Sequence, residues 1–187
     1  MSHTTSRAAA PERPLAVQLA LELSLTAGFT VAIVAGAHLR LPLPFTPVPL
    51  TLQTLAVLLA GACLGPRLGF AAATGYLLLS LLGLPVMAGP SFLGPTGGYV
   101  LGFILAAVIM GLSVRSGSWG WLIAGAGLAS LTILVCGSLW LGAYTGGNWA
   151  RAFQLGMLPF LPGDALKTAA AILIVRQFAP QMRRLLG

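Results

Sequence analysis

Long apolar runs alternate along the chain with segments that are rich in proline and glycine or carry single charges. The apolar runs lie at about 15–39, 50–65, 68–83, 97–114, 119–142 and 159–178. A helix needs roughly 20 mostly apolar residues to cross about 30 Å of hydrocarbon. We therefore expect an all-α integral membrane protein with six transmembrane helices, which together form one membrane domain over residues 15–180.

The second and third runs are short and are separated by Gly65, Pro66 and Arg67. Proline lacks a backbone N–H and disfavours helix in the residue before it. A break is therefore predicted at this point. The two runs can be read as two helices or as one bent hairpin.

The composition excludes a water-soluble fold. Hydrophobic residues make up 57% of the 187 residues and charged residues 7%, which is far more apolar than a typical soluble domain. The net charge of +7 comes from basic residues that are scattered singly between the apolar runs and form no patch. We expect a lipid bilayer around the chain and no nucleic-acid partner.

The basic residues predict how the chain is oriented in the membrane. If the N-terminus is inside, seven arginines are inside and two are outside. The inner set is Arg7, Arg13, Arg67, Arg115, Arg176, Arg183 and Arg184, and the outer set is Arg40 and Arg151. Lys167 falls within the last span. The positive-inside rule therefore favours an N-in/C-in arrangement.

The two ends of the chain are more polar than the rest. We expect residues 1–14 to form a disordered cytoplasmic tail and residues 181–187 a short basic cytoplasmic tail. The first apolar run is too long, and too poorly followed by a cleavage site, for a secretory signal. No cleaved targeting segment is expected.

The segments on the outer side are long and chemically varied, whereas those on the inner side are minimal. The outer segments are 39–54, 83–99 and 144–164. Irregular backbone at membrane depth is tolerated where it packs over protein or lines a cavity. We therefore expect the binding chemistry at the outer face.

Asp164 and Lys167 are the most informative ionisable residues. Asp164 is one of three acids, with Glu12 and Glu22, and Lys167 is the only lysine. The two lie three residues apart on one helix face, and ionisable residues within a span usually face a cavity or the protein interior. The aspartate can accept N–H groups and the lysine can donate to a carbonyl or carboxylate of a small ligand. The alternative is a salt bridge that only caps the helix.

Other polar candidates lie near the outer half of the spans. They are Thr51, Gln53, Tyr76, Ser80, Tyr99 and Asn148. The segment Gly94–Tyr99, which includes Gly97, opens the fourth span, where free N–H groups and the helix dipole can hold an anionic or polar group. Its alternative interpretation is a tight turn followed by close helix packing.

The first span carries small residues at Gly28, Ala32 and Gly36, which share one helical stripe. Such stripes let helices approach closely in lipid. Packing within the chain and contact with a partner protein are both open.

Several activities are excluded. The only lysine lies in GDALK rather than after a Gly-rich loop, so the chain lacks the Walker A lysine for ATP. Clusters of Asp, Glu or His for a metal are absent from the sequence, and Cys63 and Cys136 lie apart in apolar spans as expected for buried structural cysteines. We predict no enzymatic activity and no cofactor, so any energy for transport must come from another polypeptide.

Four motifs together resemble the BioY family of biotin-specific S components of energy-coupling factor (ECF) transporters. They are PVPLTLQTLAVLLAGACLGPRLG (47–69), YLLLSLLGLPV (76–86), GPTGGYVLGF (94–103) and LPFLPGDALK (158–167). The resemblance implies a six-helix, N-in/C-in S-component bundle in a prokaryotic plasma membrane. It also implies capture of biotin, as ligand rather than cofactor, at the outer face. Coupling would be to a transmembrane T component and two ATPase subunits.

The resemblance further implies roles for individual residues. Asp164 and Lys167 would anchor biotin, and Ser80 would stand where a polar side chain reaches the ureido group. Further candidates are Tyr76, Gln53, Tyr99 and Gly97. The coupling stripe of the family would fall on Gly28, Ala32 and Gly36, although that stripe is normally built from alanines.

Two alternatives stay open beside this reading. One is an S component for a different vitamin, and the other is a membrane scaffold in which Asp164 and Lys167 form only a structural ion pair. The resemblance also admits a homo-oligomer, and transport without the energy-coupling partners.

Overall fold

The computed structural model describes residues 14–186, with side chains placed as far as Phe178. In chain order the elements are α1 (Leu15–His38), β1 (Arg40–Leu41), β2 (Leu50–Thr51), α2 (Gln53–Leu81), α3 (Gly97–Arg115), α4 (Trp119–Tyr144), α5 (Trp149–Gly156), the 3-10 helix η1 (Leu158–Phe160) and α6 (Leu161–Leu186). The tail predicted at 1–14 lies, apart from Pro14, outside the described residues. The side chains of the segment predicted at 181–187 lie outside them too.

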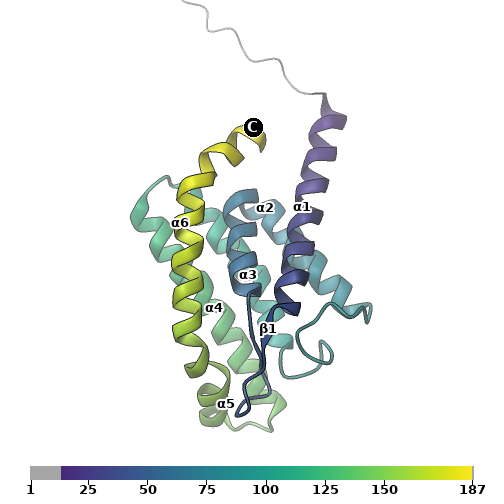
Figure 1. The fold of residues 1–187 in the computed structure, drawn as a ribbon, viewed down its shortest axis with the longest axis vertical. Coiled ribbons are helices and arrows are strands. Elements are labelled where there is room, and N and C mark those ends of the chain that lie inside the picture. The colour runs from purple at the N-terminus through teal and green to yellow at the C-terminus, as the bar shows by residue number, and fades with distance from the viewer. Residues whose placement is uncertain (1–13, 187) are drawn as a thin grey trace, which may run out of the picture.

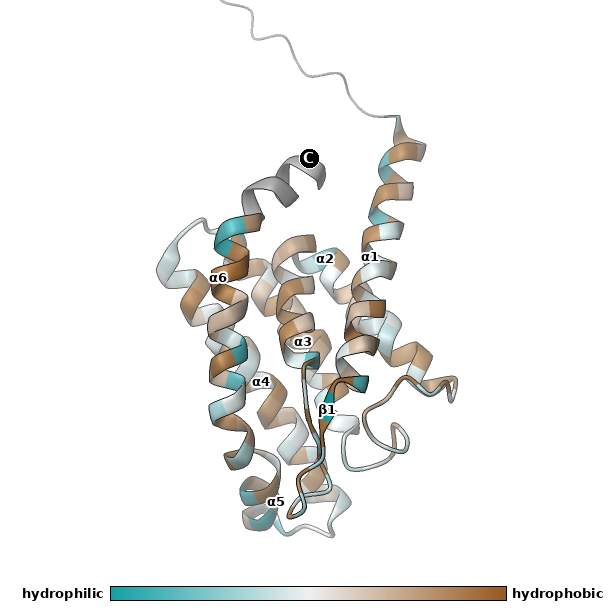
Figure 2. Cartoon of the chain, in the orientation of Figure 1, coloured by the Kyte–Doolittle hydropathy of each residue, from teal (hydrophilic) through white to brown (hydrophobic). Residues whose placement is uncertain are grey.

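Over residues 14–186, five helical stretches are long and apolar enough to cross a membrane. They are α1, α2, α3, α4 and the stretch Trp149–Phe178, which includes α6. Hydrophobic residues cover most of their length (Figure 2). The all-α membrane class is therefore confirmed. The count of six is not, because the runs expected at 50–65 and 68–83 form the single element α2.

The chain of α2 reverses direction at Gly65. This glycine has φ 78° and ψ 176°, which is outside the helical region and open chiefly to glycine. A Cβ built on Gly69 would lie 2.9 Å from the Cα of Gly61, whereas eight residues along a straight helix span about 12 Å. The two arms of α2 therefore pack against each other, as expected where Pro66 interrupts the helical hydrogen bonds.

Helix α3 is the centre of the bundle, and small residues let its neighbours approach closely. A Cβ on Gly61 of α2 would lie 2.2 Å from the carbonyl oxygen of Ala107, and one on Gly102 would lie 2.9 Å from the Cα of Ile133 in α4. Backbone-to-backbone packing of this kind is typical of membrane helices. It holds α3 between α2 and α4.

The irregular segments gather at the end of the bundle opposite the start of α1 and the end of α6 (Figure 1). There β1 and β2 form a short antiparallel hairpin with Arg40 opposite Thr51, and α5 follows α4. Their proline- and glycine-rich sequences predict only irregular backbone in these stretches. Helix α5 has a sequence signal after all, because the side chain of Asn148 accepts a hydrogen bond from Arg151 N at 3.0 Å and caps the helix.

Candidate ligand-binding site

A small buried cavity lies where α2, α3, α4 and α6 meet the irregular end of the bundle. Its polar lining residues are Thr51, Gln53, Thr54, Tyr76, Thr96, Tyr99, Asp164 and Lys167. Its apolar lining residues are Val48, Pro49, Met87, Ala88, Val100, Phe103, Ile133, Leu134 and Phe160. The volume of the cavity is about 40 Å³. An apolar cavity with a few convergent polar groups is the usual form of a small-molecule site.

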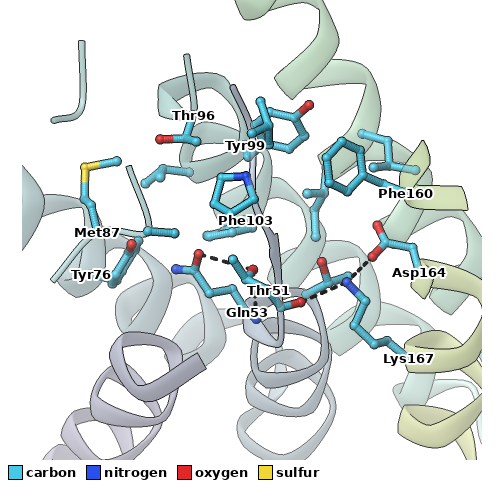
Figure 3. Close-up of a pocket in the computed structure, with 17 residues that line it drawn as sticks. Thr51, Gln53, Tyr76, Met87, Thr96, Tyr99, Phe103, Phe160, Asp164 and Lys167 are labelled. Atoms are coloured by element: carbon cyan, nitrogen blue, oxygen red, sulfur yellow. Dashed lines mark hydrogen bonds and ion pairs between the residues drawn. The ribbon is translucent and has the colours of Figure 1, made fainter. Parts of the chain in front are cut away.

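Asp164 and Lys167 occupy one side of this cavity, as Figure 3 shows. Asp164 is 3% exposed and Lys167 9% exposed. The Lys167 ammonium forms an ion pair with Asp164 Oδ1 and donates to the carbonyl oxygen of Thr51 at 3.0 Å. The pair sits in the first turns of α6, one helical turn apart, as the spacing predicted. A strong acceptor and a strong donor therefore lie side by side at the wall of the cavity.

Gln53 and Tyr76 line the cavity from the two arms of α2. Gln53 is 4% exposed, and its side-chain nitrogen Nε2 lacks a well-formed hydrogen bond in the described structure. Tyr76 is fully buried, and its hydroxyl donates to the carbonyl oxygen of Val86 at 3.3 Å. Both side chains lie across the cavity from Asp164 in Figure 3. The cavity thus has a polar group on each side and an apolar middle.

Tyr99 presents its ring rather than a free hydroxyl to the cavity. The hydroxyl donates to the carbonyl oxygen of Gly156 at 2.5 Å, so it already has an acceptor at the end of α5. The ring packs at an edge-on angle against Phe160 with centroids 6.3 Å apart. Together with Phe103, these rings form the aromatic part of the wall.

Three candidates from the sequence do not line the cavity. Ser80 is buried, but its hydroxyl donates to Tyr76 O at 2.9 Å and its side chain faces a neighbouring hollow. Gly97 serves close packing, because a Cβ there would lie 2.0 Å from the carbonyl oxygen of Phe92. Asn148 caps α5. Ligand contacts of Ser80 and Gly97 stay predictions.

The neighbouring hollow is larger, with about 810 Å³ for water-sized molecules, and is more open. It lies between the 42–49 loop and the 82–96 loop and shares Pro49, Met87 and Ala88 with the buried cavity. The Arg40 guanidinium, on β1, donates to the carbonyl oxygen of Ala88. Pro49, Met87 and Ala88 therefore form the partition between the outer hollow and the cavity.

The small-residue stripe on α1 is divided between two environments. Gly36 is buried, and a Cβ there would lie 3.0 Å from the backbone nitrogen of Gln53, so it packs within the chain. Ala32 is half-buried. Gly28 is exposed, and a Cβ there would meet nothing within 4 Å. Contact of this stripe with a partner stays a prediction.

Sequence reasoning missed three kinds of wall residue. Thr96 lies inside the GPTGGY motif but was not singled out, and Phe103 and Phe160 looked like any apolar residue of a span. Met87 and Ala88 lie in the 82–96 loop, and their place depends on how that loop folds back. The quoted motifs offered a usable signal for Thr96, Phe103 and Phe160, and also for Thr54, whereas Met87 and Ala88 had none.

Comparison with known proteins identifies the family. The family model described as "BioY family" matches residues 6–184. The chain belongs to the BioY family. It is 42% identical over 163 residues to a protein of Pyrococcus horikoshii named "Probable biotin transporter BioY", covering 84% of this chain and 96% of that one. It is 38% identical over 152 residues to "Biotin transporter BioY" of Thermotoga maritima, covering 78% of this chain and 88% of that one.

A solved structure is similar in fold as well. The structure is described as the S-component for biotin from an ECF-type ABC transporter, and the likeness has a TM-score of 0.79 at 28% sequence identity. It covers 89% of this chain and 94% of the other. The bundle described above is therefore similar to the fold of an ECF S component.

Proposed function

We propose that this BioY family member is the biotin-capturing S component of an ECF-type uptake transporter. The observation that carries the proposal is the buried Asp164–Lys167 ion pair on the wall of a cavity lined by both apolar and uncharged polar side chains. Relatives named as biotin transporters and a structural neighbour described as a biotin S component support the same ligand.

The chemistry of the pair suits the ureido ring of biotin. A ureido group places N–H donors beside a carbonyl acceptor, and the Asp164 carboxylate and the Lys167 ammonium offer the complementary pair at neighbouring positions. Asp164 and Lys167 would bind the ureido ring while they keep the ion pair that they already form with each other. The fused rings of the ligand would pack in the apolar middle of the cavity, against the side chains of Phe103 and Phe160.

Access to the cavity requires a change of shape. The space of about 40 Å³ admits no more than a few water molecules, so a bicyclic ligand enters only if the partition of Pro49, Met87 and Ala88 moves. Residues of this partition belong to the 42–49 and 82–96 loops. Arg40 of β1, which directly precedes the first loop, donates to the Ala88 carbonyl oxygen in the second. We infer that these loops part when biotin enters from the outer hollow.

We also infer six membrane crossings with both ends in the cytoplasm of a prokaryotic cell. The reversal at Gly65 supports two crossings by α2, and Arg67 at that turn is on the side that the positive-inside rule assigns to the cytoplasm. The start of α1 and the end of α6 lie at the same end of the bundle (Figure 1). An even number of crossings has this property.

Energy for uptake would come from a T component and two ATPase subunits. The exposed part of the α1 stripe at Gly28 and the half-buried Ala32 leave room for a close helix contact with the T component. Assembly with a second copy of this chain is the alternative use of that surface.

Equilibrium binding of labelled biotin to the detergent-purified protein tests the proposal, with desthiobiotin and thiamine as competitors. We expect saturable binding that desthiobiotin displaces and thiamine does not. Displacement by thiamine would point to another vitamin. A folded protein without saturable binding would refute the capture role and favour a scaffold.

A further inference from the structure

An open groove runs between α4 and α6, which lie side by side in the bundle (Figure 1). Its volume is about 440 Å³, and both helices are long and apolar enough to cross a bilayer. Residues 123–134 of α4 and 161–172 of α6 contribute its walls, so it extends about 16 Å along the helices. The hydrocarbon of one leaflet is about 15 Å thick. The groove therefore has about the length of one leaflet.

The walls of the groove are mostly apolar. Gly127 is exposed, and a Cβ there would meet nothing within 4 Å, which leaves open space in the α4 wall. Ser130 and Thr168 are the uncharged polar lining residues. Asp164 and Leu134 line the ligand cavity as well, so the groove lies on the other side of the cavity wall. The large apolar lining residues are Ile123, Leu131, Leu134, Leu161 and Ile172.

A positive charge lies at one mouth of the groove. Arg176 follows Ile172 by one helical turn in α6. Trp119 precedes Ile123 by one turn in α4. The Arg176 guanidinium lies over the Trp119 ring, 4.4 Å from the ring centroid, and both residues are exposed. Within residues 14–178 the side chain of Arg176 has no hydrogen bond or ion pair. The cation–π contact therefore holds the guanidinium at the mouth and leaves its N–H donors available.

The charge of Arg176 is not neutralised by an acidic side chain of the described residues. The acids between residues 14 and 178 are Glu22, on α1, and Asp164, about 18 Å away along α6, and Arg176 is paired with neither. Trp119 begins α4, and its N-cap residue Ser118 makes no side-chain capping hydrogen bond. The unpaired N–H groups of that first turn add positive potential beside the guanidinium. The mouth is therefore complementary to an anion.

We propose that the α4–α6 groove binds one anionic phospholipid, with an acyl chain in the groove and the headgroup phosphate at Arg176. The groove opens on the surface that membrane-spanning helices present to lipid, and a guanidinium without a carboxylate partner is a strong donor to phosphate. The orientation inferred above places this headgroup in the cytoplasmic leaflet, whose anionic lipids attract basic residues. The site does not depend on biotin capture, so either inference can fail without the other.

The test is lipid binding to the purified full chain. Native mass spectrometry counts retained lipids, and thermal unfolding in detergent reports stabilisation by added lipid. The probes are phosphatidylglycerol, phosphatidylcholine with the same acyl chains, and glycerol 3-phosphate, which has no acyl chain. We expect one retained phosphatidylglycerol per chain, about tenfold weaker binding of phosphatidylcholine, and no stabilisation by glycerol 3-phosphate at the same concentration. Equal binding of the two lipids, or equal stabilisation by glycerol 3-phosphate, would overturn the proposal.

Two kinds of variant separate the headgroup contact from the groove. Arg176→Gln should lower the affinity for phosphatidylglycerol about tenfold, to that of phosphatidylcholine, whereas Arg176→Lys should keep the preference. Arg67→Gln is its matched control, because Arg67 is also exposed and does not line the groove. Gly127→Leu fills the groove and should abolish retention of the lipid. Gly28→Leu is the control for it, since a Cβ at Gly28 also meets nothing within 4 Å.

The remaining outcomes are decisive as well. Wild-type retention by folded Gly127→Leu, or a wild-type lipid preference in Arg176→Gln, would overturn the proposal. Equal losses in the two control variants would overturn it too, because the lipid would then belong to a general annulus. If Gly127→Leu splits a dimer in light scattering but retains lipid, the groove is an interface between copies of the chain. If Gly127→Leu does not fold, as judged by gel filtration and thermal unfolding, Arg176→Gln and Arg176→Lys decide.

Discussion

Removing the charge of Asp164 is the sharpest test of the binding site. Asp164→Asn keeps the shape of the side chain and one acceptor oxygen but leaves the Lys167 ammonium without a counter-ion. Both groups are more than nine-tenths buried, and the ammonium then has only neutral acceptors, which are the asparagine amide oxygen and the carbonyl oxygen of Thr51 at 3.0 Å. The variant therefore perturbs the stability of the protein as well as its binding.

The two effects have different sizes. Leaving a buried charge unpaired costs about 3–5 kcal/mol of folding free energy. Loss of one charge-assisted hydrogen bond to the ligand costs about 1–3 kcal/mol, and since every 1.4 kcal/mol is tenfold in affinity, biotin should bind about 5- to 150-fold more weakly. Thermal unfolding followed by tryptophan fluorescence measures the first effect, and equilibrium binding of labelled biotin measures the second.

A double variant separates a binding role from a structural one. Asp164→Leu with Lys167→Met removes both charges, and replacement of a buried ion pair by apolar groups is often neutral or stabilising. We expect this protein to melt at or above the temperature of Asp164→Asn and still to bind biotin poorly. If Asp164→Asn or the double variant binds biotin as the wild type does, the pair is only structural and our reasoning about the cavity is wrong.

Further predictions concern packing, topology and coupling. Gly98→Ala should lower stability by about 1–3 kcal/mol, because its Cβ would lie 2.1 Å from a tryptophan Cβ on α4, while Gly127→Ala, with nothing within 4 Å, should not; equal melting temperatures would contradict this. In intact cells, a membrane-impermeant maleimide should label Asn148→Cys but reach Ser116→Cys only after permeabilisation, and the reverse pattern would invert the proposed orientation. Gly28→Leu should leave melting and biotin affinity unchanged, since no neighbour is within 4 Å, yet reduce co-purification with the T component; unimpaired co-purification would exclude that surface.

The membrane class of this protein follows from its sequence alone. With 57% hydrophobic and 7% charged residues the chain belongs in lipid, and its long continuous apolar runs indicate helices and where they lie. The pairing of Asp164 with Lys167 also follows from the sequence, because residues three apart on a helix are neighbours whatever surrounds them. The four motifs at 47–69, 76–86, 94–103 and 158–167 together were sufficient to suggest the family.

Only the tertiary structure decided what meets the pair across the cavity. Gln53, Thr96 and Asp164 are far apart in the chain and come together because α2 reverses at Gly65 and small residues let α3 approach α2 and α4. The same packing turned Gly97 toward its neighbours rather than the cavity. Sequence periodicity describes one helix at a time, so it cannot specify contacts that depend on how several helices and two loops fold over one another.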